Sequence, residues 1–338
     1  MIVVLKPNTS EPDIAAVVEE IKRLNYEPRV LRGVELTVIA AIGDERTHSN
    51  LEMLTVFPQV DRVMPVQSRY KLVKRQVHPA NSVVQANGRI PIGGKKFQVM
   101  AGPCSVENEK QLLGTAHAVK KAGATILRGG AFKPRTSPYE FQGLGEPGLK
   151  LLAKAKQETG LAIITELLSE QHANLVAEYA DILQIGTRNA QNFQLLIAAA
   201  KTGKPVLLKR GLSMRIEEWL LAGEYVIANG NPNLLFCERG IRTFETYTRN
   251  TLDLAAIPII KQESHCPIVI DPSQGAGRAD LVVAMCKGAV AMGADALLIE
   301  VHPNPAEAWS DGAQQLSLDG FAKLMEDLKP FIAAAGRE

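Results

Sequence analysis

Residues 97–105 read FQVMAGPCS, a short apolar run that ends in glycine, proline and two polar residues. The same plan recurs along the chain: an apolar run, a polar or glycine-bearing cluster, and then enough residues for a helix. Eight such runs are predicted to be strands, at Phe97–Ala101, Thr125–Leu127, Ala162–Thr165, Ile182–Ile185, Pro205–Leu208, Leu234–Cys237, Pro267–Ile270 and Ala296–Ile299.

These runs are nearly continuous in apolar residues, which is typical of parallel strands that are buried on both faces. Successive runs start about 20 to 37 residues apart, which leaves room for a helix after each strand. Eight such units over about 240 residues match the size of a (β/α)8 TIM barrel. An open doubly wound sheet is disfavoured, because it needs fewer strands and usually a glycine-rich first turn, and the chain has no GxGxxG.

The first 70 residues follow a different pattern, with the order strand, helix, strand, strand, helix, strand. This order is that of a ferredoxin-like α+β domain. The expected strands are Ile2–Leu5, Glu27–Arg32, Glu35–Ala41 and Val60–Val66, and the expected helices are Glu11–Leu24 and Ser49–Phe57. The segment has no cluster of titratable residues, so oligomerisation and ligand sensing both stay open as its role.

Residues 71–97 are predicted to be a linker and hairpin between the ferredoxin-like domain (1–70) and the barrel domain (98–338). The segments Ser82–Gln85 and Arg89–Ile92 flank Ala86-Asn87-Gly88. An Asn-Gly pair between two extended segments is a strong signal for a tight hairpin turn.

Composition limits the possible partners and compartments. The 338 residues carry a formal net charge of +2, which indicates neither a nucleic acid nor another polyanion as a partner. The apolar runs are far shorter than a membrane span, and the N-terminus lacks the features of a signal peptide. The four cysteines form no CxxC pair, so we expect a reduced, cytoplasmic protein.

Cationic residues gather where the predicted strands end. In a TIM barrel the active site lies at the C-terminal ends of the strands. Arginine binds phosphate and carboxylate groups through two parallel hydrogen bonds. A single such residue is more often part of a surface ion pair, but several at one rim indicate a substrate set with several negative groups, at least one of them a phosphate. The rim cations are Arg128, Lys133, Arg135, Arg188, Lys209 and Arg239.

A second group at the same rim indicates a metal site. Cys104 follows the first strand, and Glu300 and Asp311 follow the eighth. These two strands become neighbours when the barrel closes. A thiolate with carboxylates suits a divalent transition ion such as Mn²⁺, Fe²⁺, Co²⁺ or Zn²⁺.

Several motifs together resemble the 3-deoxy-D-arabino-heptulosonate 7-phosphate (DAHP) synthases. The closest type is the single-barrel (type Iβ) form with an N-terminal ferredoxin-like domain, and the resemblance covers essentially the whole chain. The motif KPRTS at 133–137 separates this family from its sister family, the octulosonate 8-phosphate synthases. The motifs are AGPCSVE, RGGAFKPRTSPY, FQGLG, QIGTRNAQNF, LLKRG, CERGIRTFE, DPS and IEVHPNP followed by SDG.

The resemblance implies condensation of phosphoenolpyruvate with erythrose 4-phosphate, the first step of the shikimate pathway to aromatic amino acids. It places phosphoenolpyruvate against Arg128, Lys133, Lys209 and Arg239, with Arg188 on the phosphate side. Glu166, which ends the third strand, is a further candidate for substrate binding. It places erythrose 4-phosphate against the segment from Lys133 to Ser137, including Arg135 and Thr136. Lys133 is the candidate that delivers a proton to the aldehyde oxygen. A homotetramer, and tyrosine or phenylalanine as a feedback ligand of the N-terminal domain, are also implied.

One position departs from the family pattern. The resemblance implies Cys104, Glu300, Asp311 and a histidine after the seventh strand as metal ligands, but this chain has Gln274 in DPSQ. An amide oxygen is a weaker ligand than imidazole. Three hypotheses stay open: Gln274 coordinates weakly through oxygen, His302 replaces the missing histidine, or the site is poor in metal and the enzyme slow or altered.

Three other functions compete with this assignment. The first is a Schiff-base aldolase with Lys209 as the nucleophile. The second is the sister octulosonate 8-phosphate synthase, which KPRTS argues against. The third is a catalytically impaired barrel that acts as a binding or regulatory subunit, for which Gln274 is the sole support.

Overall fold

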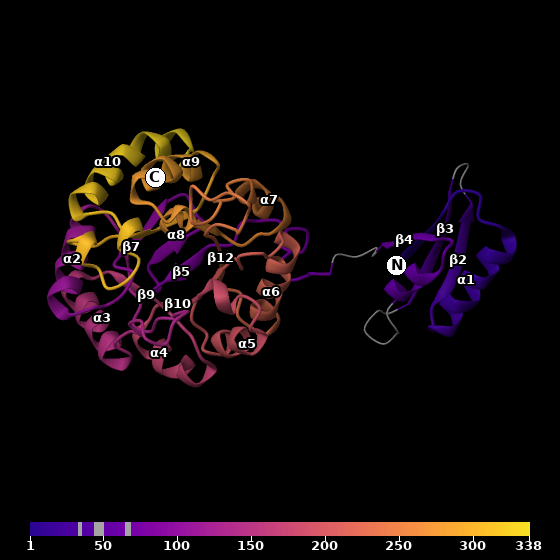
Figure 1. Cartoon of the computed structure of the whole chain (residues 1–338), viewed down its shortest axis with the longest axis horizontal. Helices are drawn as coiled ribbons and strands as arrows, with labels where there is room; N and C mark the ends of the chain where they lie inside the picture. The colour runs from indigo at the N-terminus through magenta and orange to yellow at the C-terminus, as the bar shows by residue number, and fades with distance from the viewer. Residues whose placement is uncertain (33–35, 44–50, 65–68) are drawn as a thin grey trace. The chain divides into compact units, whose positions relative to one another are not determined.

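A computed structural model describes residues 1–32, 36–43, 51–64 and 69–338. The chain divides into two compact units, residues 1–69 and residues 70–338, which are drawn in Figure 1. Five residues of predicted N-terminal elements lie outside the described residues, namely Glu35, Ser49, Asn50, Pro65 and Val66.

The N-terminal unit has the predicted ferredoxin-like fold. Its described strands form an antiparallel sheet in the order β2-β3-β1-β4, the order of a ferredoxin-like plait. The elements are β1 (Ile2–Leu5), α1 (Glu11–Arg23), β2 (Glu27–Arg32), β3 (Thr37–Ile42), the 3₁₀ helix η1 (Leu51–Val56) and β4 (Val60–Met64).

The two helices of this unit form for different reasons. Helix α1 begins after Ser10, whose hydroxyl accepts a hydrogen bond from the backbone N–H of Asp13, and Pro12 suits the first turn. The second helix was expected to be α-helical, but it is a 3₁₀ helix. Its two buried residues, Leu51 and Leu54, are three positions apart. That spacing aligns side chains in a 3₁₀ helix, so one short turn buries both against the sheet.

The C-terminal unit is the predicted TIM barrel. In residues 70–338, all of which are described, eight parallel strands close into a barrel in sequence order. Each strand lies within one residue of its predicted bounds, and six strands end one residue later than predicted, on Gly102 or on a charged residue. The strands are β7 (Gln98–Gly102), β8 (Ile126–Arg128), β9 (Ala162–Glu166), β10 (Ile182–Ile185), β11 (Val206–Lys209), β12 (Leu234–Glu238), β13 (Ile268–Ile270) and β14 (Ala296–Glu300).

Helices follow the strands and form a ring around them (Figure 1). Short helical turns precede or follow some of them at η2 (Glu170–His172), η3 (Thr187–Asn189), η4 (Pro305–Glu307) and η5 (Gly312–Gln314). The α-helices are α2 (Glu109–Lys121), α3 (Glu146–Thr159), α4 (Ala173–Tyr179), α5 (Phe193–Lys201), α6 (Ile216–Ala228), α7 (Ala256–Glu263), α8 (Pro272–Ala276), α9 (Ala279–Ala291) and α10 (Leu318–Ala334).

A hairpin closes the bottom of the barrel. Strands β5 (Val84–Ala86) and β6 (Ile90–Ile92) pair around Asn87-Gly88, and Asn87 adopts the left-handed conformation that such a turn requires. Val84 and Ile92 pack in one buried cluster with residues from inside the barrel, including Met100 and Leu298. The hairpin therefore fills the end of the barrel opposite the rim where the polar residues gather.

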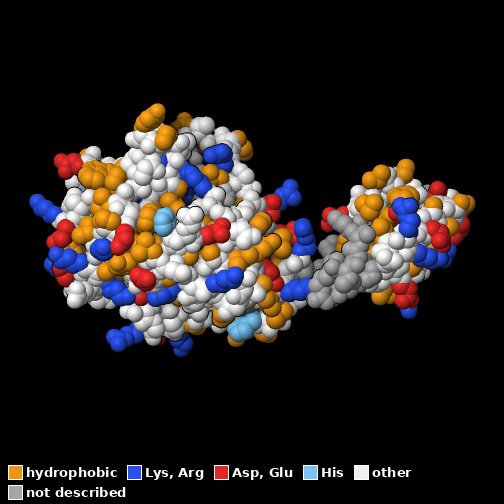
Figure 2. Space-filling model, turned by 90° about the horizontal axis from the view of Figure 1, so that it is seen from below, with side chains coloured by type: hydrophobic (Ala, Val, Ile, Leu, Met, Phe, Trp, Pro, Cys, Tyr) orange, Lys and Arg blue, Asp and Glu red, His pale blue; other side chains and the backbone are white. Residues whose placement is uncertain are grey.

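The face of the barrel unit drawn in Figure 2 shows no strong charge bias. On the side of the barrel unit that Figure 2 shows, acidic and basic side chains are mixed, in keeping with the small net charge. Among the described helices, none combines the length and the apolar character that a membrane crossing requires.

One carboxylate of the barrel anchors residues 71–73 of the segment before the hairpin. Glu224 of α6 accepts hydrogen bonds from the backbone N–H groups of Lys71 (3.0 Å), Leu72 (2.7 Å) and Val73 (3.0 Å). Three donors around one charged acceptor fix the path of this segment more firmly than neutral hydrogen bonds would.

We predict that Glu224→Ala loosens this segment. Hydrogen bonds to charged groups contribute about 1.5–3 kcal/mol each, so amide exchange at residues 71–73 should speed up at least about tenfold. Hydrogen–deuterium exchange with mass spectrometry checks this. Glu217→Ala, at an exposed position on the same helix, is the control and should leave exchange at 71–73 unchanged. Unchanged exchange in Glu224→Ala would contradict this anchoring role.

Candidate active site

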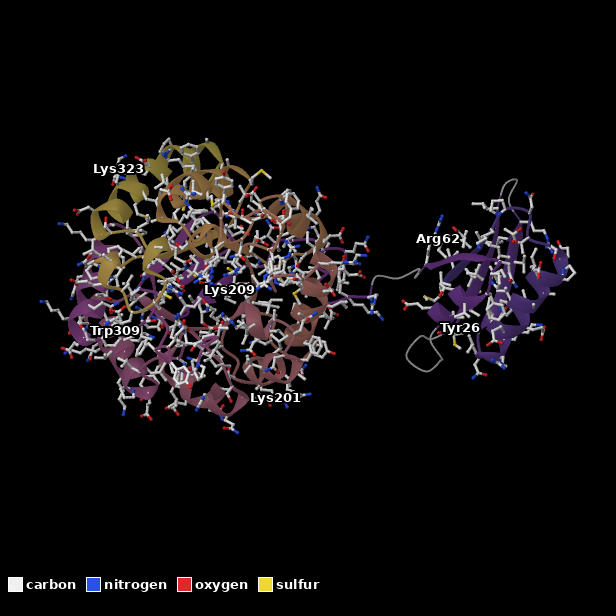
Figure 3. All side chains as sticks on the ribbon, in the orientation of Figure 1. Tyr26, Arg62, Lys201, Lys209, Trp309 and Lys323 are labelled. Carbon is white, nitrogen blue, oxygen red and sulfur yellow. The ribbon has the colours of Figure 1, made fainter. Side chains whose placement is uncertain are left out.

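The polar ends of the barrel strands surround a cavity of about 250 Å³ at the C-terminal rim. Lys209, the last residue of β11, lies near the middle of the ring of helices in Figure 3, whereas Lys201 and Lys323 lie at its periphery. Among the described residues, seven cationic side chains line the cavity against three acidic ones, Glu140, Glu166 and Asp311. The cations are Arg128, Lys133, Arg135, Arg188, Lys209, Arg239 and Arg249.

Buried acids pair with several of these cations. Arg128 forms an ion pair with Glu300 at 3.2 Å and donates to the carbonyl of Pro103 at 2.7 Å. Lys209 donates to Asp271, whose other oxygen accepts the backbone N–H of Gln274 at the start of α8. These pairs hold the cations in place before any ligand arrives, because an unpaired charge at this depth would be costly.

Arg128 keeps one donor without a partner. Its Nε is buried and has no hydrogen-bond partner among the described residues. The hydroxyl of Thr187, which also lines the cavity, is likewise buried and has no hydrogen-bond partner among the described residues. Buried polar atoms are nearly always hydrogen-bonded, so such exceptions need an explanation.

Lys133 contacts Cys104, one of the candidate metal ligands. Its Nζ lies 3.0 Å from both the carbonyl oxygen and the Sγ of Cys104. Burial acts to lower the pKa of Lys133, but Cys104, Glu166 and Glu300 outweigh it and raise the pKa overall. Lys133 is therefore an ammonium group that can donate protons within the cavity.

Glu166 ends β9 and faces the cations. Burial raises the pKa of its carboxyl group, although Lys133 and Lys209 oppose this shift. A glycine directly after the next strand, β10, makes room for it: a Cβ at Gly186 would lie 1.9 Å from Glu166 Oε1. The position of Glu166 therefore depends on glycine at 186.

Cys104, Glu300 and Asp311 come together beside the cavity. Their ligand atoms all lie within 4.8 Å of one another. Burial, with Glu300, raises the pKa of the Cys104 thiol to about 11. The thiol donates to Asp311 at 3.3 Å. Burial acts to raise the pKa of Asp311, but Arg249 and Lys133 lower it to about 2. One sulfur and two carboxylates at this spacing fit a divalent transition ion.

Gln274 lies at this group and His302 does not. The Nε2 of Gln274 donates to Glu300 at 3.0 Å and to Asp311 at 3.3 Å. Both ring nitrogens of His302 have other partners, Glu107 at 3.3 Å and the backbone N–H of Asn304 at 3.1 Å. Among the described residues the group of possible ligands contains Cys104, Glu300 and Asp311 and not His302, so this conformation gives the hypothesis that His302 replaces the missing ligand no support.

The KPRTS segment contributes to the cavity only in part. Arg135 and Thr136 line it; Arg135 pairs with Glu140 at 2.8 Å, and the Thr136 hydroxyl accepts from Arg188 at 3.4 Å. Ser137 does not line the cavity, and its hydroxyl accepts the backbone N–H of Tyr139. The role of Ser137 in substrate binding stays a prediction.

Sequence reasoning missed one cation of the site. Arg249 lines the cavity and bonds both Asp311 (3.1 Å) and Gln314 (3.2 Å). It lies eleven residues after the last residue of β12. A search for charged residues directly after each strand does not reach it. The long segment between β12 and α7, which has room to fold back over the rim, is the signal that would have found it.

Comparisons with known proteins agree with this geometry. Residues 78–334 match the DAHP synthetase I family, and residues 1–68 match the DAHP synthase ferredoxin-like domain. A phospho-2-dehydro-3-deoxyheptonate aldolase of Thermotoga maritima is 49% identical over 336 residues, which cover 99% of both chains. A 2-dehydro-3-deoxyphosphooctonate aldolase of Caulobacter vibrioides is 32% identical over 71% of this chain and 89% of its own.

A solved structure has the same architecture. The crystal structure of the Thermotoga maritima DAHP synthase superposes with a TM-score of 0.93 and 48% identity, covering 100% of this chain and 98% of that one. A truncated form of the Thermotoga enzyme covers 80% of this chain and 98% of its own, with a TM-score of 0.75 and 47% identity. With a cation-lined barrel cavity, a ferredoxin-like N-terminal unit and nearly full-length similarity, this chain belongs to the DAHP synthetase I family.

Proposed function

We propose that the rim cavity binds phosphoenolpyruvate and erythrose 4-phosphate and joins them into DAHP with release of phosphate. The observation that carries this proposal is the convergence of seven cations, from the ends of four strands and the loops that follow them, on one small cavity. The two substrates together bring a carboxylate and two phosphates, which need such a set of donors. The comparisons support this enzyme and not the catalytically impaired barrel.

Phosphoenolpyruvate is assigned to the inner cations. Arg128, Lys133, Lys209 and Arg239 are all buried at the strand ends, as a small ligand with a carboxylate and a phosphate requires. Arg188 lies on the phosphate side, and the unpartnered Nε of Arg128 is one donor left for this ligand. Glu166 lines the same cavity, where burial raises the pKa of its carboxyl group and Lys133 and Lys209 oppose this shift.

Erythrose 4-phosphate is assigned to the outer segment. Arg135 and Thr136 line the more open part of the cavity, where a second phosphate can enter after the first substrate. The side chain of Ser137 does not line the cavity. Ser137 can therefore contact the phosphate of erythrose 4-phosphate only if the segment from Lys133 to Ser137 rearranges when this substrate binds.

The reaction balances as an aldol-type condensation followed by hydrolysis. The vinyl carbon of phosphoenolpyruvate forms a C–C bond with the aldehyde carbon, and Lys133 delivers a proton to the aldehyde oxygen. Water adds at the second carbon of the former phosphoenolpyruvate, and the C–O bond to phosphate then breaks. Negative charge that develops on the oxygens is stabilised by cations already fixed in position, the effect that usually dominates in such sites.

Members of this family generally use a divalent metal. Cys104, Glu300 and Asp311 would hold it, and when bound it would polarise the aldehyde as a Lewis acid. Lys133, which contacts Cys104, is placed to serve the same aldehyde oxygen.

A Schiff-base mechanism at Lys209 fits the geometry poorly. The Lys209 ammonium group donates to the fully buried Asp271, and Lys209 itself is buried. A buried carboxylate partner stabilises the charged amine, whereas Schiff-base formation needs the neutral one.

The proposal also covers the feedback ligand, the oligomeric state and the cellular compartment of the protein. A ferredoxin-like domain in this family is typical of regulatory binding. We assign tyrosine or phenylalanine to it as the feedback ligand, a homotetramer as the assembly and the cytoplasm as the compartment.

The purified protein, supplied with a divalent metal, should release phosphate only when phosphoenolpyruvate and erythrose 4-phosphate are present together. A phosphate-release assay checks this. Replacement of erythrose 4-phosphate by a five-carbon aldose phosphate tests the sister reaction, because three plus five carbons give the octulosonate product. Faster release with the five-carbon sugar, or no release with either, would contradict the proposal.

Arg135→Ala should raise the KM for erythrose 4-phosphate by about 10- to 100-fold and leave the KM for phosphoenolpyruvate nearly unchanged. The expected size follows from about 1.5–3 kcal/mol for a hydrogen bond to a charged group. Lys201→Ala, an exposed and peripheral change, is the control and should alter neither KM. An equal rise in both KM values would show that Arg135 does not distinguish the substrates.

Gly186→Ala should lower kcat/KM at least about tenfold, because Glu166 must move to admit the Cβ and small misplacements at a reacting centre are costly. Gly114→Ala in α2 is the matched control, since an added Cβ there meets nothing within 4 Å. Steady-state kinetics of both variants, with circular dichroism to check folding, make the comparison. Full activity in Gly186→Ala would show that the position of Glu166 is unimportant.

A further inference from the structure

The side-chain amide of Gln274 lies between a guanidinium group and two carboxylates. Arg239 donates to its Oε1 at 2.8 Å. On the other side, its Nε2 donates to Glu300 at 3.0 Å and to Asp311 at 3.3 Å. The amide thus links a cation of the substrate cavity to the acidic group of the metal-ligand candidates.

The orientation of this amide is determined from both sides. A guanidinium group only donates hydrogen bonds, so the atom that faces Arg239 must be the oxygen. Ionised carboxylates only accept, so the atom that faces Glu300 and Asp311 must be the NH2 group. A half turn of the amide would place NH2 against the guanidinium group and oxygen against two carboxylates, and all three hydrogen bonds would be lost.

The backbone of Gln274 is also fixed. Its N–H donates to the buried Asp271 at 2.9 Å, and its carbonyl oxygen accepts from Asn250 at 3.0 Å. Asp271 in turn accepts from Lys209, so the residue cannot shift without disturbing a cation of the cavity. The amide is therefore held in place from the main chain as well as from its partners.

Protein donors already satisfy both carboxylates. Glu300 is paired with Arg128 at 3.2 Å and accepts from Gln314 at 2.7 Å, in addition to Gln274. Asp311 accepts from Arg249 at 3.1 Å and from the Cys104 thiol at 3.3 Å. A metal ion is therefore not needed to offset the repulsion between these two acids.

We propose that Gln274 occupies a ligand position of this site as a hydrogen-bond donor, so that Cys104, Glu300 and Asp311 are held together by the protein and bind divalent ions weakly. To coordinate a metal ion through its oxygen, the Gln274 amide would have to lose the hydrogen bond from Arg239. Its NH2 group would then face the guanidinium group of Arg239. Gln274 is a positioning residue in this account, because it acts through the two carboxylates and Arg239.

The inference concerns the site of the proposed function and rests on it only for the expectation that a divalent ion belongs there. The binding of a metal by the substrate-free protein can be measured without any turnover. A failure of the inference and a failure of the proposed reaction are therefore distinguishable.

The test is titration of the chelator-treated, full-length protein with Co²⁺, followed by calorimetry and by the thiolate-to-cobalt absorbance band. Gln274→His replaces the amide donor by an imidazole ligand, and it should lower the dissociation constant for Co²⁺ at least about tenfold. Even residues that only hydrogen-bond to a metal ligand change metal affinity by about 10- to 100-fold, so tenfold is a lower bound. It should also raise the unfolding temperature on addition of Co²⁺ more than the wild type does. Gln157→His, at an exposed position on α3, controls for nonspecific binding by an added imidazole.

Three results are informative. Weak binding by the wild type and tighter binding by Gln274→His would support the inference. Wild-type binding as tight as that of Gln274→His, with the thiolate band, would overturn it, and so would weak binding by both. If Gln274→His does not fold, Gln274→Glu serves in its place, because its carboxylate has the same reach and offers an oxygen ligand without rotation.

Discussion

Closure of eight parallel strands into one barrel brings every strand end to the same rim, and the rest of the site depends on this constraint. Charged residues that are far apart in the sequence, such as Arg128 and Arg239, are thereby forced into one small space. Seven cations in a cavity of about 250 Å³ would repel one another without counter-charges. Buried acids at the ends of other strands, Glu300 and Asp271, supply these charges and fix the cations before a substrate binds.

The acids of the rim therefore have two tasks. Glu300 and Asp311 pair with Arg128 and Arg249, and they are also metal-ligand candidates. Gln274 connects the cation cavity to the candidate metal site, since it contacts Arg239 and the carboxylates of Glu300 and Asp311. A change at this one amide consequently affects the metal affinity and the cation cavity together, which connects the departure from the family pattern to the chemistry of the site.

The sequence predicted the barrel well because its signals are local. Apolar runs marked all eight strands within one residue, but the last residue of six of them, a glycine or a charged residue, fell outside the apolar pattern. The 3₁₀ character of Leu51–Val56 was missed, since its three-residue spacing also suits an α-helix. Arg249 and the orientation of Gln274 depend on how distant loops fold together, and Ser137 was expected in the cavity from the motif alone. The pattern of residues directly after each strand does not encode these features.

The most direct measurement of the central claim is a crystal structure of the protein with bound phosphoenolpyruvate. The account predicts its carboxylate and phosphate within hydrogen-bond distance of the cations at the strand ends, with Arg128, Lys209 and Arg239 in contact and their buried acid partners unmoved. Phosphoenolpyruvate bound elsewhere, or bound only after the pairs Arg128–Glu300 and Lys209–Asp271 break, would contradict a site that the barrel forms in advance.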